Sequence, residues 1–143
     1  KLFSMAGCRL GYVVGHPDEI KMVQKLCTPH NTNAFAMLVA QKILETPGIL
    51  SSLIEDYTLG RDYLIKELNS HKYLHKGDAG NFIFIKPKTN ALTIVEKMKS
   101  QKQILIKSYS NVGNFGTCLR VTIGAKQYME RFLDALFELD NTN

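Results

Sequence analysis

The spacing of apolar residues divides the chain into helical and extended segments. A period near 3.6 residues predicts amphipathic helices. The helices expected on this basis cover residues 17–26, 34–45, 46–70, 91–101 and 125–139. Asn33 or Thr32 is suited to cap the second of them. Gly60 weakens the middle of the third, and Arg61 interrupts its apolar stripe.

Short apolar runs bounded by glycine, proline or polar residues predict strands. They occur at residues 10–15, 81–85, 104–106 and 118–123, with a flexible loop at 111–116. The second half therefore has the order strand, helix, strand, strand, helix. This order predicts helices layered on a small, partly antiparallel sheet, which is an α+β arrangement.

The helix expected at 34–45 is apolar on most sides. Such a helix is normally buried in a larger body or in an interface. We therefore expect it to pack on further protein or on a second subunit. In the second half, the helical spacing predicts that Leu92, Ile94, Met98, Tyr128 and Phe132 point into a core.

Composition excludes several classes of function. The chain has 143 residues, 45% hydrophobic and 22% charged, which is typical of a soluble globular domain. Its charge of +5 favours anionic ligands, but the basic residues are scattered, which argues against a nucleic-acid interface. No apolar run is long enough to span a membrane. Three widely spaced cysteines predict reduced, small, buried side chains and a cytoplasmic protein.

Two cationic residues near the start carry candidate chemistry. Lys1 and Arg9 are separated by eight positions, with Gly7 and Gly11 close by. A Schiff base requires an amine that can lose its proton, and lysine is the side chain that supplies one. The rigid fork of arginine suits a phosphate dianion, and glycine permits tight turns beside it. Taken alone, however, the pattern is more typical of a solvated terminus and an ordinary surface arginine than of a cofactor site.

The segment from Lys1 to Tyr12 resembles the segment that begins at the cofactor lysine in fold-type I pyridoxal-phosphate aminotransferases. It is most similar to the histidinol-phosphate aminotransferase branch, with the pattern Lys-x-Phe-Gly-x-Ala-Gly-x-Arg-x-Gly-Tyr; only Ser4, where glycine is common, departs from it. The resemblance implies an α/β fold with an α+β small domain, and pyridoxal 5'-phosphate as cofactor. It also implies that Lys1 binds the cofactor and then moves the substrate proton, and that Arg9 holds the cofactor phosphate.

A second segment, Leu119 to Gly124, resembles the family's Leu-Arg-Ile-Thr-Val-Gly. The resemblance implies that Arg120 makes a two-pronged contact with the acidic group of the substrate. Thirteen residues earlier, Lys107 stands where histidinol-phosphate aminotransferases usually have an arginine that holds the substrate phosphate. Lys107 can still meet an anion, or it can be a solvated lysine at a strand end. Asn81–Phe82 also matches a family position, but Asn81 can equally cap a turn, so we leave it outside the site.

In the family, the cofactor lysine falls past the middle of a chain more than twice this long. The resemblance therefore implies that residues 1–45 end the large cofactor-binding domain. Residues 46–143 would form a long linking helix and the small domain. The expected protein is a homodimeric aminotransferase that acts on an anionic amino substrate and a 2-oxo acid such as 2-oxoglutarate. This chain alone is expected to be an incomplete enzyme. A decarboxylase of a phosphorylated amino acid and a non-catalytic α+β binding module remain alternatives.

Overall fold

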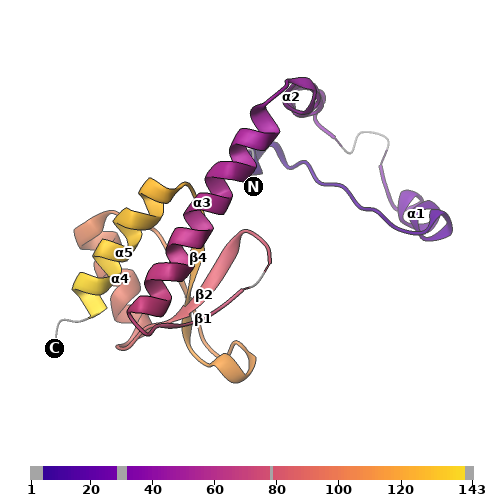
Figure 1. The fold of residues 1–143 in the computed structure, drawn as a ribbon. Coiled ribbons are helices and arrows are strands. Elements are labelled where there is room, and N and C mark those ends of the chain that lie inside the picture. Colours follow the sequence, from indigo (N-terminus) through magenta and orange to yellow (C-terminus); the bar gives the residue numbers. More distant parts are fainter. Residues whose placement is uncertain (1–4, 29–31, 78, 141–143) are drawn as a thin grey trace. The chain divides into compact units, whose positions relative to one another are not determined.

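A computed structural model describes residues 5–28, 32–77 and 79–140 of the chain (Figure 1). Lys1 lies outside the described residues. The chain divides into two compact units, residues 1–53 and 54–143, and each is described by itself. The predicted domain division between residues 45 and 46 stays a prediction.

The first unit contains a short 3-10 helix, η1 (Ala6–Cys8), and the helices α1 (Pro17–Gln24) and α2 (Ala34–Glu45). It also holds the first turns of α3 (Ile49–Ser70). Asn33 caps α2, since its side-chain oxygen accepts from the backbone N–H groups of Phe35 at 2.9 Å and Ala36 at 3.3 Å. The predicted helix at 34–45 and its cap are therefore confirmed.

The strand expected at 10–15 is wrong for the described unit. These residues form no regular secondary structure, and Tyr12 is 94% exposed. A strand requires a neighbouring strand to accept its backbone hydrogen bonds. The described part of this unit contains no strand with which residues 10–15 could pair.

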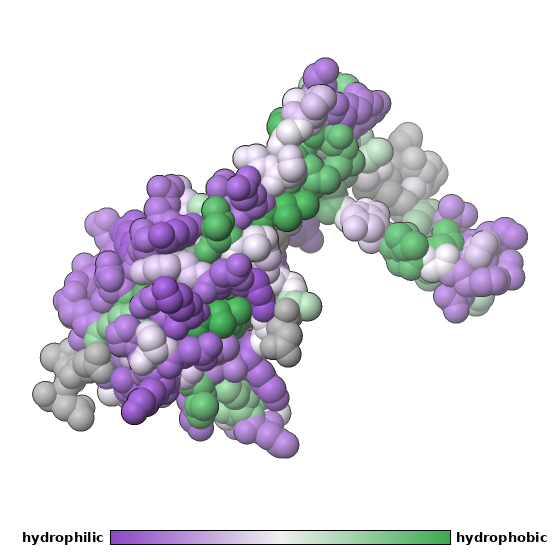
Figure 2. Space-filling model, viewed as in Figure 1, coloured by the Kyte–Doolittle hydropathy of each residue, from purple (hydrophilic) through white to green (hydrophobic). Residues whose placement is uncertain are grey.

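The apolar residues of α2 are mostly exposed. Ala36 is the only residue classed as buried in the described part of the first unit, whereas Phe35 is 80% exposed. Figure 2 shows hydrophobic surface around α2 and the first turns of α3. Large exposed apolar surfaces in proteins mark contacts with other protein. The exposure agrees with the expectation that α2 packs on further protein.

The second unit is a four-stranded sheet with helices. The strands are β1 (Leu74–Lys76), β2 (Phe82–Lys86), β3 (Lys107–Tyr109) and β4 (Cys118–Thr122). Their spatial order is β1-β2-β4-β3, and every neighbouring pair is antiparallel. The helices are the rest of α3, α4 (Ala91–Lys102) and α5 (Lys126–Asp140), with a 3-10 turn, η2 (Gly113–Phe115). The predicted α+β architecture is confirmed.

The helices cover one face of this sheet (Figure 1). Ile83 and Ile85 of β2 and Leu119 of β4 are completely buried in a core shared with α3, α4 and α5. Since side chains alternate along a strand, Phe82, Phe84 and Arg120 point to the other face. We call this second surface the open face of the sheet.

Two details of the sheet differ from the prediction. β1 was not expected, since its three residues, Leu-His-Lys, carry no apolar alternation. The third strand starts at Lys107, not at residue 104. The backbone N–H of Ile104 donates to the carbonyl of Met98 at 3.0 Å, so this residue closes the end of α4 and does not join the ladder.

Three predicted burials are also wrong. Leu92 is 63% and Tyr128 60% exposed, because each lies just outside the stripe of its helix that faces the core. Cys27 is exposed, whereas Cys118 is buried as expected. Among the described residues, no helix is long and apolar enough to cross a membrane.

Gly60 has a packing role that its helical position did not reveal. It is buried in α3, and a Cβ atom placed on it would lie 1.9 Å from the carbonyl oxygen of Gly124. Glycine therefore allows α3 to approach the segment between β4 and α5. The neighbouring Arg61 donates through Nη2 to the carbonyl of Gly77, which ties α3 to the end of β1.

Candidate active site

Arg9 ends the short helix η1 in the first unit. Its φ of 55° is left-handed, and its N–H donates to the carbonyl of Ala6 at 3.4 Å. The tight turn expected from the glycines is therefore made by Arg9, since neither Gly7 nor Gly11 has a positive φ. A left-handed non-glycine residue costs about 1 kcal/mol or more, and such residues cluster at ligand sites.

The surroundings of Arg9 are compatible with a phosphate group. Arg9 is exposed and forms no ion pair with a described residue. A Cβ atom on Gly7 or Gly11 would meet no atom within 4 Å, so the space beside both glycines is open. A guanidinium next to open space matches the donor chemistry that a phosphate dianion requires. Lys1 lies outside the described residues, and its role stays a prediction.

Arg120 lies at the centre of the open face in the second unit. It is the middle residue of β4, between the buried Leu119 and Val121. Its guanidinium carbon stands 4.2 Å from the ring centroid of Phe82, and its Nη1 donates to the hydroxyl of Tyr109 at 3.4 Å. Strand alternation thus places this arginine on the face of the sheet away from the core.

Lys107 is the direct cross-strand partner of Arg120. The β3–β4 register pairs the Cα atoms of Lys107 and Arg120. Directly opposite residues have Cβ atoms about 4.5–5.5 Å apart and share one face of the sheet. The structure therefore brings together two of the predicted site residues. Two like charges at this spacing are mutually destabilising unless an anion lies between them.

No carboxylate neutralises this pair within the part of the chain that the structure describes. The ion pairs there involve His16, Lys21, Lys102 and Lys126, and none involves Lys107 or Arg120. An unneutralised cationic pair on an aromatic surface is suited to bind an anion from solution. No group of three or more metal-ligating side chains is found among the described residues.

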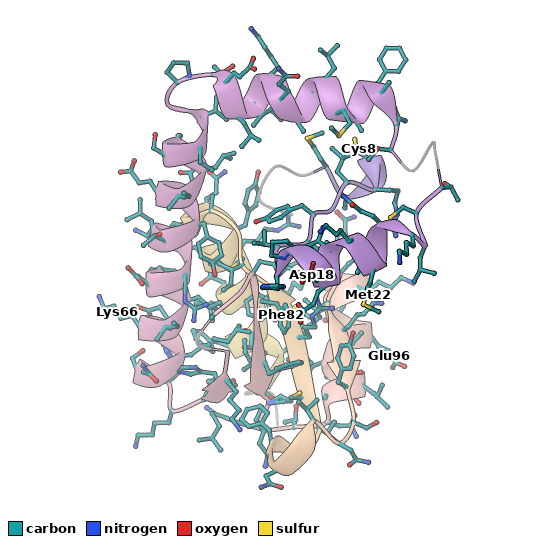
Figure 3. All side chains as sticks on the ribbon, turned by 90° about the vertical axis from the view of Figure 1, so that its right-hand side faces the viewer. Cys8, Asp18, Met22, Lys66, Phe82 and Glu96 are labelled. Carbon is teal, nitrogen blue, oxygen red and sulfur yellow. The ribbon has the colours of Figure 1, made fainter. Side chains whose placement is uncertain are left out.

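Phe82 and Tyr109 are contacts of Arg120 that sequence reasoning did not include. Phe82 is labelled in Figure 3; it comes from β2, and Tyr109 comes from β3, on opposite sides of Arg120. Alternation along β2 could have placed Phe82 on the open face. The contact with Tyr109 could not be foreseen, because it depends on a strand register that the sequence pattern placed three residues too early.

Arg9 belongs to the first unit, and the Lys107–Arg120 pair to the second. Their joint role stays a prediction. The comparison with known proteins identifies the family. Residues 1–136 match the family model described as aminotransferase class I and II. The chain belongs to this family.

Several relatives of this aminotransferase chain are named histidinol-phosphate aminotransferase. The histidinol-phosphate aminotransferase of Moorella thermoacetica is 28% identical over 139 residues, which are 97% of this chain and 36% of that protein. Histidinol-phosphate aminotransferase 2 of Nitrosococcus oceani is 33% identical over 135 residues, which are 92% of this chain and 37% of that protein. The chain thus spans less than two fifths of the length of these two curated relatives.

Solved structures agree on the fold. The crystal structure of a protein from Erwinia carotovora atroseptica, assigned as a histidinol-phosphate aminotransferase, superposes with a TM-score of 0.80 at 23% identity. It is matched over 96% of this chain and 39% of its own. An assigned aminotransferase from Burkholderia pseudomallei gives a TM-score of 0.76 at 21% identity, over 99% of this chain and 43% of its own. The expected family and fold are confirmed, and enzymes of this family depend on pyridoxal phosphate.

Proposed function

We propose that the protein is a pyridoxal-phosphate-dependent aminotransferase that transfers the amino group of a histidinol-phosphate-like donor to a 2-oxo acid such as 2-oxoglutarate. The observation that carries this proposal is the pairing of Arg120 with Lys107 on the open face, at positions where the sequence resembles the family's substrate-binding segments. The membership of residues 1–136 in the aminotransferase family supports the reaction type.

The proposed roles follow from the chemistry of each side chain. When bound, pyridoxal phosphate supplies an aldehyde that takes up the amino group and a ring that withdraws electrons from the substrate carbon. The Lys1 amine would hold the cofactor and then move the proton of the substrate carbon. Arg9 would bind the cofactor phosphate through two parallel N–H donors.

On the open face, Arg120 would bind the carboxylate of the 2-oxo acid and the acidic group of the amino donor. Lys107 would add a second positive charge directly across the ladder. A lysine meets an anion as a point charge and lacks the two-pronged geometry of arginine. The site should therefore accept phosphorylated amines and amino acids, with less geometric selectivity for phosphate than a site with two arginines.

We also propose that the enzyme is a homodimer that works in the cytoplasm. The exposed apolar side chains of α2, among them Phe35 and Leu38, support contact with more protein than this chain supplies. Sedimentation of the full-length protein as a dimer is expected, and a monomer at micromolar concentration would contradict the proposal.

The reaction is tested with the full-length protein, pyridoxal phosphate, histidinol phosphate and 2-oxoglutarate. We expect glutamate to form as the donor is consumed. Arg120→Lys should lower kcat/KM tenfold or more, because lysine lacks the two-pronged guanidinium of arginine. The matched control is Arg131→Lys on α5, whose Nη2 binds the carbonyl of Lys102, and it should leave kcat/KM unchanged. Release of carbon dioxide from a phosphorylated amino acid, without glutamate, would instead establish the decarboxylase.

A further inference from the structure

Arg120 lies between aromatic side chains from both neighbouring strands. The Phe82 ring of β2 lies 4.2 Å from the guanidinium carbon, and the Tyr109 hydroxyl of β3 accepts from Nη1 at 3.4 Å. A guanidinium within about 6 Å of a ring centroid is attracted by the ring's π electrons. Two different attractive contacts therefore act on one side chain.

A third ring connects these two contacts. Phe84 packs edge-on against Phe82, with centroids 5.4 Å apart, and edge-on against Tyr109, with centroids 6.1 Å apart. Edge-to-face pairs at these distances are attractive. The three rings thus form a layer on the open face, and each restricts the orientation of the next.

Packing in the core does not explain why a phenylalanine stands at position 82. Side chains that point to the core from β2 are Ile83 and Ile85, which are completely buried, whereas Phe82 is half-buried on the opposite face. An aromatic side chain on an uncovered face contributes less to folding than a core residue does. Instead, its ring packs against the guanidinium of Arg120 and the ring of Phe84.

Arg120 needs such support because of its neighbour. Lys107 lies directly opposite and repels it, and a free arginine side chain also samples many rotamers. The Phe82 ring lies against the guanidinium carbon, and the Tyr109 hydroxyl accepts a hydrogen bond from Nη1, on the side nearest the side-chain stem. Nε and Nη2, which together form a two-pronged edge, donate no hydrogen bond to any described residue.

We propose that Phe82 is a positioning residue for Arg120: its ring, with the Tyr109 hydroxyl, fixes the guanidinium so that Nε and Nη2 face the incoming carboxylate. The inference rests on the proposed role of Arg120 as the anion-binding residue. It adds a residue whose effect on substrate binding is indirect, since Phe82 acts through its contact with the guanidinium of Arg120.

The test uses the full-length protein and succinate, a dicarboxylate that cannot exchange an amino group. Succinate binding is measured by calorimetry for wild type, Phe82→Leu, Phe82→Tyr and Phe137→Leu. Phe137 is the matched control: it is a half-buried phenylalanine on α5 whose ring stacks on His71, with centroids 3.9 Å apart, on the helical side of the sheet. The proton resonances of the Arg120 guanidinium are followed by NMR in the same samples.

We expect Phe82→Leu to weaken succinate binding about fivefold to tenfold, the size of one cation–π contact. Phe82→Tyr keeps the ring and should bind like wild type, as should Phe137→Leu. The Arg120 resonances should lie upfield in wild type because of the ring current. They should move toward ordinary arginine values in Phe82→Leu.

Equal succinate binding by wild type and Phe82→Leu, including no binding by either, would overturn the inference. If Phe82→Leu fails to fold, the wild-type spectrum still decides, since unshifted Arg120 resonances would contradict a guanidinium that lies over the Phe82 ring. Failure of this inference can be distinguished from failure of the proposed function. Turnover with glutamate formation tests the reaction, whereas succinate binding requires neither cofactor attachment nor catalysis.

Discussion

At the scale of single residues, Gly60 and Asp140 determine how closely the elements of the second unit approach one another. Gly60 leaves room for the carbonyl of Gly124, and Asp140 at the end of α5 accepts hydrogen bonds from the segment that precedes α4. Neither residue is part of the candidate site. Each nevertheless supports the sheet that carries Arg120, because each fixes a helix that packs on it.

Gly60→Ala should destabilise the protein although alanine favours helices. The new Cβ would lie 1.9 Å from the Gly124 carbonyl oxygen, so α3 or the backbone after β4 must move. Overpacking of this kind costs about 1–3 kcal/mol, more than the gain of about 1 kcal/mol from helix propensity. Urea denaturation monitored by circular dichroism measures the difference. Asp62→Ala, exposed on the same helix, should change stability by less than about 0.5 kcal/mol; an equal effect of both variants would refute the close approach.

Asp140→Asn should cost about 1–3 kcal/mol at neutral pH. Its carboxylate accepts from the backbone N–H groups of Lys88 and Thr89, both at 2.8 Å, and from the Thr89 hydroxyl at 2.6 Å. An amide can replace only one of the two acceptor oxygens. The exposed Asp134→Asn on the same helix is the control and should change stability by less than about 0.5 kcal/mol.

The effect of Asp140→Asn should also depend on pH. Burial raises the pKa of Asp140, but hydrogen bonds from Thr89 and Lys88 outweigh burial and leave the pKa below its ordinary value. A lowered pKa in the folded state stabilises the protein above the unfolded-state pKa of about 3.9, and this stabilisation is lost as the pH falls through the folded-state pKa. The stability gap between wild type and Asp140→Asn should therefore narrow below about pH 4. A gap that stays constant down to pH 2 would contradict this assignment.

At the scale of elements, the β3–β4 ladder determines what the open face can bind. The sequence pattern predicted both strands and the position of Arg120 on β4. The pattern placed β3 three residues too early because Ile104 to Ile106 are apolar. The backbone N–H of Ile104, however, donates to the carbonyl of Met98 at the end of α4. Apolar periodicity reports which side chains are covered. It does not report which backbone groups pair, so the contact of Tyr109 with Arg120 emerged only from the register.

Lys107→Gln should raise the stability of the protein and weaken its binding of anions. Removing one charge relieves the repulsion across the ladder, so we expect a gain in stability of up to about 0.5 kcal/mol. Binding of inorganic phosphate should weaken, because one of the two cations is gone. Lys107→Arg should bind phosphate more tightly than wild type, since it restores a second fork. Lys99→Gln on α4 is the control for loss of charge, and equal phosphate binding by all four proteins would exclude Lys107 from the site.

At the scale of the whole molecule, the two units differ in how much of their apolar surface is covered. The second unit has a continuous core that includes Leu64, Ile83 and Leu133, whereas the described part of the first unit buries only Ala36. The sequence predicted this contrast through the all-round apolar pattern of residues 34–45. It could not show that residues 10–15 would remain unpaired, because a strand depends on a partner strand as much as on its own residues.

Hydrogen exchange of the 143-residue chain should reproduce this contrast. Amides of β2, β4 and α5 should exchange slowly, since they are hydrogen-bonded in or beside the core. Amides of residues 10–15 should exchange within the shortest time measured, because no described residue accepts from them. Equal protection of residues 10–15 and β4 would show that the first unit is more structured than its geometry indicates.

The central claim is tested most directly by an absorption spectrum of the full-length protein with pyridoxal phosphate, before and after borohydride reduction, followed by peptide mapping. We predict a visible band from the lysine-bound cofactor, which reduction fixes to the peptide that contains Lys1. Lys1→Ala should abolish both the band and the labelled peptide. No visible band, or reduction that labels another lysine, would contradict the assignment of Lys1 and favour a non-catalytic binding module.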